Sequence, residues 1–276
     1  MLKKRLIFTL LYSNGQFMLS RNFRLQKVGN LRWLQTNYKV SQISYSIDEL
    51  VVLDVSRGEK KSVEFCDALK HLTEGCFVPI AAGGGVKTIE AARNLLRAGA
   101  DKVVVNSVLY EKNDFIKQLA SEFGQQCIVA SMDIKSSPDG SYQVWADCGS
   151  RHIAGSVAHW IELIAQDYIG ELYLNSMDRD GTGQGYDFRL LDLLPANMAK
   201  PVILAGGVGN ATHLASGMAD IRVDAVATAN LFNFVGDGLK LARQTLISGG
   251  VRLPLWNIEM LEKHLRLEEP VPVRND

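Results

Sequence analysis

One ionisable residue stands where it could act on a substrate. Asp133 ends an apolar run within CIVASMDIK, residues 127–135. A carboxyl group at the end of a buried strand can accept or donate a proton during a reaction. The same carboxyl could instead cap the loop that follows the strand. Both interpretations fit this segment taken by itself.

Pairs of small or polar residues follow several apolar runs, where they could bind phosphate. Glycine lets backbone N–H groups approach an anion, and the N-terminus of a following helix attracts negative charge. Tight turns also need glycine, so an isolated pair has a simpler explanation. Because the pairs occur in both halves of the chain, they predict two anion sites that face each other. The candidate residues are Gly84, Gly85, Asn106 and Ser107, followed by Asp180, Gly181, Gly206, Gly207, Ala229 and Asn230.

The recurrence of these pairs reflects an internal repeat. Three segments of the first half resemble three segments of the second, in the same order and at offsets of 122 or 123 residues. Such regular spacing indicates two homologous halves. The matching segments are PIAAGGGV (79–86) with PVILAGGV (201–208), ELVVLDVSR (49–57) with ELYLNSMDR (171–179), and ADKVVVNSVL (100–109) with VDAVATANLF (223–232).

Each half contains four short runs rich in Val, Ile and Leu, which are typical of parallel strands buried on both faces. Helical patterns separate the runs, and TIEAARNLLRAG at 88–99 has Thr88 as its expected N-cap. Eight such units predict an α/β fold, a (β/α)8 TIM barrel with an internal two-fold repeat. A doubly wound open sheet is the alternative, but a repeat of four units closes more naturally. The runs lie near 5–11, 49–54, 78–83, 102–106, 127–133, 171–176, 201–205 and 224–229.

The repeat also sets the expected domain organisation. We expect one barrel over residues 1–255, with half-barrels at about 1–122 and 123–245. The remaining residues, 256–276, would form a C-terminal tail. Residues 12–46 have the least clear pattern, and we expect them to form a long loop after the first strand.

The offset relates Asp133 to a residue that cannot exchange protons. Leu11 occupies the equivalent position at the end of the first strand. In a (β/α)8 barrel these two positions would face each other on the side where active sites lie. A barrel with a carboxyl at both positions could use one to donate a proton and the other to accept it. This chain retains only the second.

Composition disfavours several other functions. Thirty Lys and Arg balance thirty Asp and Glu, so no overall field attracts nucleic acid or an anionic membrane. The longest apolar runs are strand-sized, and the start MLKKRLIFTLLYSNG has no clear signal-peptide cleavage site. The four cysteines are scattered, which predicts a cytoplasmic protein. Neither cysteine nor histidine spacing suggests a metal site, and we expect no cofactor.

The motifs together resemble one family. Over about residues 1–255, the chain resembles the cyclase subunit of imidazole glycerol phosphate synthase. The resemblance implies a (β/α)8 barrel, a lyase of histidine biosynthesis, that receives ammonia from a HisH-type glutaminase at the barrel's N-terminal face. Ammonia would cross the barrel and react with a bis-phosphorylated, nucleotide-like substrate at the opposite mouth. The motifs are MLKKRLI, DELVVLDV, AAGGGVKT, RAGADKVVVNS, MDIK, LNSMDRDGTGQGYD and AGGVGN.

The resemblance assigns a catalytic role to Asp133. The family uses two aspartates as acid and base, on the first and fifth strands; Asp133 matches the second, whereas Leu11 stands at the position of the first. Ala205 and Asn175 also differ from the expected Ser and Thr. Loss of a positioned acid or base typically lowers a rate by about 10²–10⁴. These departures predict weakened cyclase chemistry.

The residues that the family uses for ammonia entry are all present. Four strand-start residues match a charged ring that guards the ammonia entrance, and their charges sum to zero, as a partly buried ring requires. Asp101 matches a residue at the glutaminase interface, although it could simply be a turn or helix-end charge. The ring residues are Arg5, Glu49, Lys102 and Glu171.

One further segment resembles a subgroup of the family. RNFRLQKVGN, residues 21–30, is similar to barrels associated with surface-polysaccharide synthesis. In that subgroup the barrel and its glutaminase feed ammonia to an ATP-dependent amidotransferase that makes acetamidino sugars. Our first hypothesis is a divergent paralogue that delivers ammonia to a phosphorylated acceptor or to such an amidotransferase. The alternatives are a functional cyclase that replaces the lost acid with another group, and a non-catalytic docking conduit.

Overall fold

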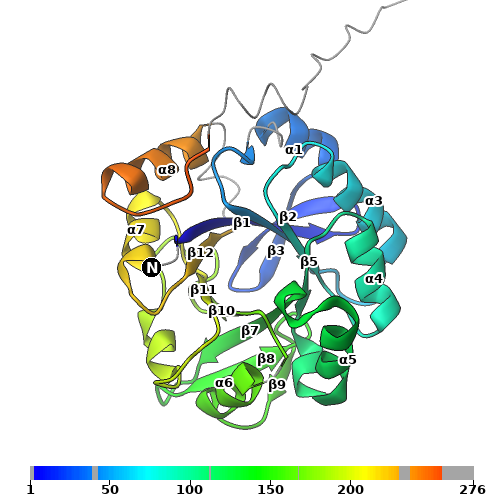
Figure 1. Cartoon of the computed structure of the whole chain (residues 1–276), viewed down its shortest axis with the longest axis vertical. Coiled ribbons are helices and arrows are strands. Elements are labelled where there is room, and N and C mark those ends of the chain that lie inside the picture. The colour runs from blue at the N-terminus through cyan, green and yellow to red at the C-terminus, as the bar shows by residue number, and fades with distance from the viewer. Residues whose placement is uncertain (1–2, 39–42, 112, 167, 230–236, 257–276) are drawn as a thin grey trace, which may run out of the picture.

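The eight apolar runs form a closed barrel of parallel strands, as the sequence predicted. The computed structural model describes residues 3–38, 43–111, 113–166, 168–229 and 237–256. Each strand pairs with its neighbours in chain order, and pairing of β12 with β1 and of β10 with β7 completes the ring (Figure 1). The barrel strands are β1 (Arg5–Ser13), β4 (Glu49–Asp54), β5 (Ile80–Gly83), β6 (Lys102–Val105), β7 (Ile128–Ser136), β10 (Glu171–Ser176), β11 (Val202–Ala205) and β12 (Ala225–Thr228).

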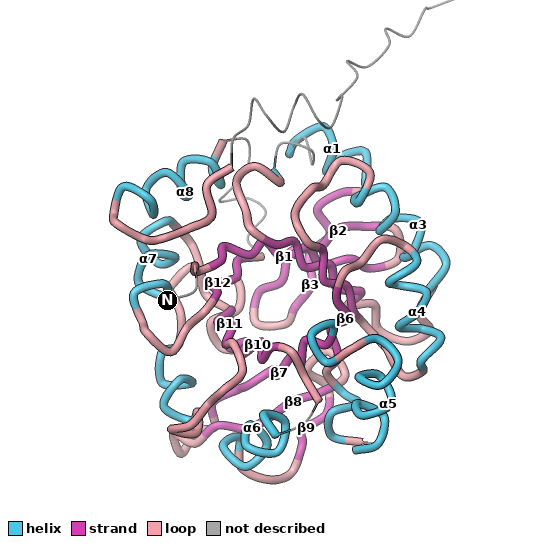
Figure 2. The backbone as a smooth tube through the Cα atoms, viewed as in Figure 1, coloured by secondary structure: helices cyan, strands magenta, loops and turns pink. Residues whose placement is uncertain are grey.

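Helices cover the outside of the barrel (Figure 2). The predicted N-cap of α4 is confirmed, because the Thr88 hydroxyl accepts a hydrogen bond from the Ala91 amide at 3.1 Å. Ala92 and Leu95 bury the inner face of this helix. No helix in the described ranges is long and apolar enough to span a membrane. The helices are α1 (Leu31–Tyr38), α3 (Ser62–Thr73), α4 (Ile89–Arg97), α5 (Asn113–Phe123), α6 (Val157–Gln166), α7 (Ala211–Ala219) and α8 (Gly238–Ser248).

The segment after the first strand differs from our expectation of a long loop. It forms a hairpin of β2 (Gln16–Arg21) and β3 (Arg24–Gly29), followed by α1. Both turns of this antiparallel unit have two consecutive residues with positive φ, at Asn14–Gly15 and at Asn22–Phe23. Such turns match the twist of paired strands. The loop prediction was wrong because the many charged residues of the hairpin obscure its strand pattern.

A second hairpin repeats this arrangement in the other half. It consists of β8 (Tyr142–Ala146) and β9 (Arg151–Ile153) and follows β7 directly. The tips of the two hairpins lie against each other, since a Cβ added at Gly149 would be only 2.7 Å from a ring carbon of Phe23. The two-fold repeat therefore extends to the structures above the barrel.

Three aspartates tie together the starts of neighbouring barrel strands. Asp48 accepts a hydrogen bond from the amide of Leu6 at 2.8 Å, and Asp224 accepts one from Val202 at 2.9 Å. Asp101 does the same for Ile80 at 2.8 Å. The exposed Asp101 thus has a structural contact, and its place at a glutaminase interface stays a prediction.

Apolar side chains pack on both faces of the barrel strands. Residues that point outward form a large core with the helices, while every second residue points into the bore. The inward cluster combines branched side chains such as Ile7 and Val129 with small ones on β5, β11 and β12. The small residues are Ala81, Ala205, Ala225 and Ala227. Above the strand starts, the bore is therefore predominantly apolar.

Candidate functional site

A pocket of about 560 Å³ opens at the C-terminal ends of the barrel strands. This is the side of a (β/α)8 barrel on which active sites lie. Asp133 lines the pocket, and so do nine of the ten candidate phosphate-binding residues. The tenth, Asn230, lies outside the described residues. The structure thus brings together, in one cavity, the described residues that the sequence assigned to the mouth.

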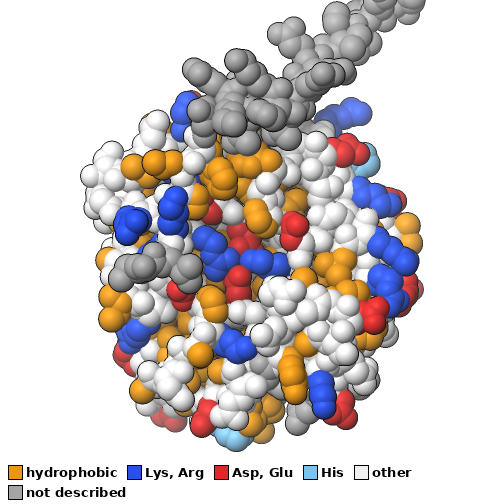
Figure 3. All heavy atoms as spheres, in the orientation of Figure 1, with side chains coloured by type: hydrophobic (Ala, Val, Ile, Leu, Met, Phe, Trp, Pro, Cys, Tyr) orange, Lys and Arg blue, Asp and Glu red, His pale blue; other side chains and the backbone are white. Residues whose placement is uncertain are grey.

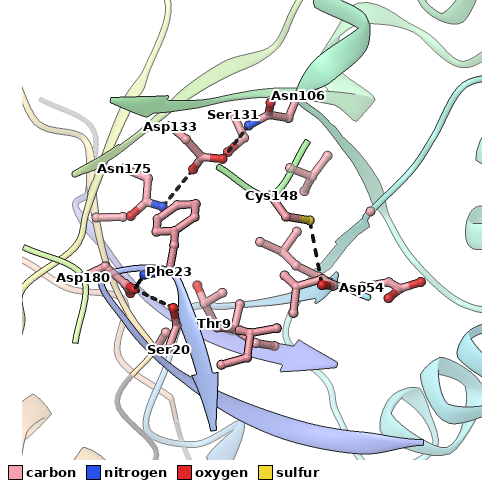
Figure 4. Close-up of a pocket in the computed structure, with 18 of the residues that line it drawn as sticks. Thr9, Ser20, Phe23, Asp54, Asn106, Ser131, Asp133, Cys148, Asn175 and Asp180 are labelled. Atoms are coloured by element: carbon pink, nitrogen blue, oxygen red, sulfur yellow. Dashed lines mark hydrogen bonds between the residues drawn. The ribbon is translucent and has the colours of Figure 1, made fainter. Parts of the chain in front are cut away.

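Two amides hold the carboxylate of Asp133. The Nδ2 of Asn175 donates to one oxygen at 2.9 Å, and the Nδ2 of Asn106 donates to the other at 3.0 Å (Figure 4). Burial raises the pKa of Asp133 to about 6, and the negative charge of Asp180 adds to this effect. The two amide donors oppose the shift. The carboxyl can therefore accept and release a proton close to neutral pH.

Asn175 was noted in the sequence only as a departure from the family pattern. In the structure it is one of two residues that fix the orientation of Asp133. The strand register explains this contact, because Asn175 on β10 pairs directly with Asp133 on β7. Knowing which strands are neighbours in the closed barrel would have been enough to find it.

Leu11 points into the pocket and contributes no polar group there. It lies on β1 beside Leu53 of β4, and both side chains line the cavity. Two residues below, the hydroxyls of Thr9 and Tyr173 form a hydrogen bond of 3.2 Å. This pair crosses from β1 to β10 at the floor of the pocket. Leu11 and Leu53 therefore form an apolar patch at this place in the mouth.

Asp180 connects the pocket to the first hairpin. Its Oδ2 accepts hydrogen bonds from the Ser20 hydroxyl at 2.5 Å and the Phe23 amide at 2.9 Å (Figure 4). Burial raises the pKa of this carboxyl. Ser20 and Phe23 lie in the segment that we expected to be a loop, and our sequence analysis did not assign them to the site.

The glycine pairs of the two halves occupy equivalent positions. A Cβ on Gly84 would lie 2.2 Å from the carbonyl oxygen of Asp54, and one on Gly206 would lie 2.6 Å from that of Ser176. Both glycines have positive φ, at 116° and 93°. A side chain at either position would therefore clash with the backbone of the preceding strand. Whether these loops bind phosphate stays a prediction.

Three cations also line the pocket, and our sequence analysis did not single them out. Arg57 and Lys60 follow β4, and Lys87 follows β5. The Lys60 ammonium donates to the carbonyl oxygen of Asp54 at 2.7 Å. In the sequence, each of them follows the end of a predicted strand.

The four predicted ring residues meet at the opposite end of the bore. Arg5 contacts Glu49 at 2.7 Å and Glu171 at 2.9 Å, while Lys102 contacts Glu49 at 3.0 Å and Glu171 at 2.9 Å. Figure 3 shows basic and acidic side chains gathered at the centre of this face. Each charge therefore has two opposite neighbours, and the ring closes the base of the barrel.

These features define a class of protein, a (β/α)8 barrel with a charged ring at one end and a carboxylate-bearing pocket at the other. The family model described as "Histidine biosynthesis protein" matches residues 36–236. A relative from Parasynechococcus marenigrum (strain WH8102), named "Putative imidazole glycerol phosphate synthase subunit hisF2", is 44% identical over 244 residues, which cover 88% of this chain and 90% of the relative. The chain belongs to the histidine biosynthesis protein family and is a barrel of the HisF type within it.

Proposed function

We propose that this chain is the synthase subunit of a glutamine-dependent complex. It takes ammonia from a HisH-type glutaminase at its N-terminal face and delivers it to a phosphorylated acceptor at the mouth, or onward to an ATP-dependent amidotransferase. The observation that carries the proposal is the closed ring of four charges beneath an apolar bore that ends in a pocket. The relative's name, a subunit of imidazole glycerol phosphate synthase, supports the same kind of complex.

The ring and the bore suit the passage of neutral ammonia. An ammonium ion would have to lose its hydration to enter an apolar bore, which is costly, whereas NH3 carries no net charge. The ring lets a small molecule pass when one of its ion pairs parts transiently. Because each cation keeps a second carboxylate partner, opening one pair leaves no charge without compensation.

At the mouth, Asp133 is the group that handles protons. As the nitrogen of ammonia adds to a carbonyl carbon of the acceptor, the π electrons of the C=O bond move to its oxygen, which takes up a proton from water, and the nitrogen loses a proton to the carboxylate of Asp133. The pKa of about 6 leaves this carboxyl ionised, and able to accept that proton, near neutral pH. Leu11 supplies no acid on the opposite side, so a reaction that needs both groups is slowed.

The position of Asp180 supports a second candidate function, that of a functional histidine-pathway cyclase. It is the other carboxyl that acts electrostatically on Asp133 within the same pocket. Burial raises the pKa of Asp180, which is the direction that a proton donor requires. Its oxygen Oδ2 is already occupied by two donors from the first hairpin, which is why we place this candidate second.

An assay with ammonium and the bis-phosphorylated cyclase substrate separates these candidates. We compare the native chain with Leu11→Asp and Asp133→Asn. Under our first proposal the native chain turns over slowly, and Leu11→Asp raises the rate by about tenfold or more. Under the second, native turnover is robust and Leu11→Asp changes little.

A parallel assay with glutamine and the glutaminase tests ammonia delivery. Glu171→Gln should lower glutamine-dependent output more than ammonium-dependent output, since it opens the ring but leaves the pocket intact. Equal losses in both assays would contradict the proposed route through the barrel. If Asp133→Asn leaves every output unchanged, the chain is instead a non-catalytic docking conduit.

A further inference from the structure

Three hydroxyl groups interrupt the apolar bore just below Asp133. Thr9 on β1 and Ser131 on β7 lie on opposite sides of the pocket, and Tyr173 on β10 is the direct register partner of Ser131 (Figure 4). Each of these three residues, which we call the hydroxyl belt, is no more than 6% exposed. Polar groups at such depth normally have hydrogen-bond partners, so a belt of them inside an apolar bore calls for an explanation.

The internal repeat accounts for two of the three hydroxyls. At an offset of 122 residues, Thr9 corresponds to Ser131, so both half-barrels place a small hydroxyl at the same height in the bore. At the same offset, Tyr173 corresponds to Val51. The second half therefore has a long, hydroxyl-bearing side chain where the first half has a short apolar one.

Tyr173 reaches across the bore to β1. Its hydroxyl shares a hydrogen bond of 3.2 Å with that of Thr9, although β11 and β12 lie between β10 and β1 in the ring of strands. The two intervening strands present only small side chains, Ala205 and Ala227, to the floor of the pocket. These small residues leave the space that the phenol ring fills.

The pocket ends at the belt. Thr9, Ser131 and Ala227 line the pocket, whereas the residues two positions earlier on the same strands do not. Those residues belong to the inward apolar cluster and are at most 1% exposed. They are Ile7, Val129 and Ala225. The belt thus separates the open pocket from the closed bore, and a molecule that arrives through the bore has to part the hydrogen bond between Thr9 and Tyr173.

The belt has hydrogen-bonding capacity to spare. A hydroxyl group has one donor and two acceptor sites. The Ser131 hydroxyl has no hydrogen-bond partner among the described residues. Burial raises the pKa of Tyr173 above its ordinary value, so this hydroxyl keeps its proton and can donate it. Because the belt contains no charged side chain, it suits a neutral polar guest better than an ion.

We propose that the hydroxyl belt is a binding station for neutral ammonia between the bore and the pocket. Ammonia both accepts and donates hydrogen bonds, so a molecule that inserts between Thr9 and Tyr173 replaces the bond that it breaks. Ser131 offers a further acceptor below Asp133, which lies two residues further along β7. The inference rests on the proposed function, because it takes the passage of ammonia through the barrel as given and adds where ammonia is held.

The station makes passage easier at the point where the bore is closed. Without the hydroxyls, ammonia would have to displace a packed aromatic ring and gain no hydrogen bond in return. Ammonia from solution reaches the pocket by way of the mouth and does not cross the belt. Loss of a belt hydroxyl should therefore slow the supply from the glutaminase more than the supply from solution.

A labelling experiment compares these two supplies in one reaction. The full chain and its HisH-type glutaminase receive glutamine labelled with heavy nitrogen in its amide, together with unlabelled ammonium and the bis-phosphorylated cyclase substrate. Mass spectrometry then gives the ratio of labelled to unlabelled nitrogen in the product. Because both nitrogens react in the same pocket, this ratio does not depend on how fast the chemistry is.

Variants of the belt should lower the ratio. For Tyr173→Phe we expect a fall of about fivefold, as for the loss of one hydrogen bond. Thr9→Val removes the other half of the same bond, so it should have a similar effect, and the double variant should fall little further. Ser131→Ala should have a smaller effect, of about twofold.

Tyr186→Phe is the matched control. It also removes a buried tyrosine hydroxyl, but one that donates to the carbonyl oxygen of Ala227 from the outer core. It should leave the ratio unchanged. Thermal unfolding of each variant shows whether it is folded.

An equal ratio in Tyr173→Phe and Tyr186→Phe would overturn the proposal. So would a higher ratio in Tyr173→Phe than in the native chain, because the hydrogen bond would then only obstruct ammonia. Glu171→Gln in the same assay tests the route itself. If the ratio falls in Glu171→Gln alone, ammonia crosses the barrel without being held at the belt, and the proposed function stands. If it falls in none of the variants, the route through the barrel is wrong and the station with it.

Discussion

The two ends of the barrel differ in how they compensate charge. At the base, each of four charged side chains contacts two of the opposite sign, with N–O distances between 2.7 and 3.0 Å. At the mouth, the half-buried carboxyl of Asp133 has two amide donors and, among the described residues, no cation within ion-pair distance. The base is an electrostatically complete structure, whereas the mouth holds a carboxylate that its surroundings do not neutralise.

Under the proposed function, this difference separates an end that contributes stability from an end that handles protons. A closed ring of ion pairs keeps the strand starts in register and leaves little for a ligand to add. An uncompensated buried carboxylate is costly for folding, and groups with perturbed pKa values gather at functional sites. Changes at the base should therefore lower stability, while changes at the mouth should lower activity and can raise stability.

The largest expected effect on stability is at the base. Glu49→Gln removes a carboxylate that contacts both Arg5 and Lys102 and is only 1% exposed. We expect the free energy of unfolding to fall by about 2–4 kcal/mol, because two partly buried cations then share one carboxylate. Urea denaturation measures the loss. Glu90→Gln, which removes an exposed partner of Arg93 on α4, is the control and should be close to neutral.

A loss of the same size in both variants would mean that the ring contributes no more to the free energy of unfolding than an exposed ion pair does. So would a Glu49→Gln chain as stable as the native one. Either result would mean that the apolar core alone holds the strand starts together.

At the mouth, the sign of the stability effect is reversed. Asp133 has a folded-state pKa of about 6, above its ordinary value, so its ionised form destabilises the fold. Asp133→Asn should therefore raise the free energy of unfolding by about 1–2 kcal/mol above about pH 7. The substitution is accommodated if the amide of Asn106 flips, since its buried Oδ1 has no partner among the described residues and can accept from the new side chain.

The advantage of Asp133→Asn should depend on pH. The folded-state carboxyl takes up a proton near pH 6 and the unfolded-state carboxyl only near pH 4, so the penalty shrinks over this interval and is absent below about pH 4. The stabilities of the native and variant chains should therefore converge in acid. Denaturation series at several pH values measure this. A difference that stays constant with pH would show that the carboxyl does not titrate in this range.

The strands were predictable because their signal is local. Each barrel strand is a short apolar run, and the repeat supported the count by matching the halves segment by segment. The first hairpin was missed because its strands carry charged residues at exposed positions, such as Arg24 and Lys27, that mask the alternation of a strand. Its tip matters to the site, since Ser20 and Phe23 contact Asp180.

Within the site, individual positions were predictable and their contacts were not. The offset identified Leu11 as the counterpart of Asp133, and both line the pocket. The two amides that hold Asp133 come from the end of β6 and from β10, the strands on either side of β7, and only the order and register of these strands bring them together. That Arg57, Lys60 and Lys87 share a cavity with Asp133 was likewise visible only once the loops could be assigned to it.

The smallest expected effect lies between the two ends, at the floor of the pocket. Tyr173 on β10 and Thr9 on β1 share a hydrogen bond of 3.2 Å across the bore. Tyr173→Phe removes it while keeping the ring, and the remaining Thr9 hydroxyl faces the pocket, where water can replace the lost partner. We expect the free energy of unfolding to fall by less than about 1 kcal/mol. Urea denaturation measures the change.

Tyr186→Phe is the matched control for this change. The Tyr186 hydroxyl donates to the carbonyl oxygen of Ala227 at 3.1 Å in a fully buried setting, where water cannot substitute. Its loss should cost about 1–2 kcal/mol, more than the loss of the Tyr173 hydroxyl. The opposite order would mean that the Thr9–Tyr173 bond braces the barrel across its bore. In that case the side chains at the middle of the bore would contribute to stability as the ring at the base does. Only Asp133 and the residues above it would then differ from the base.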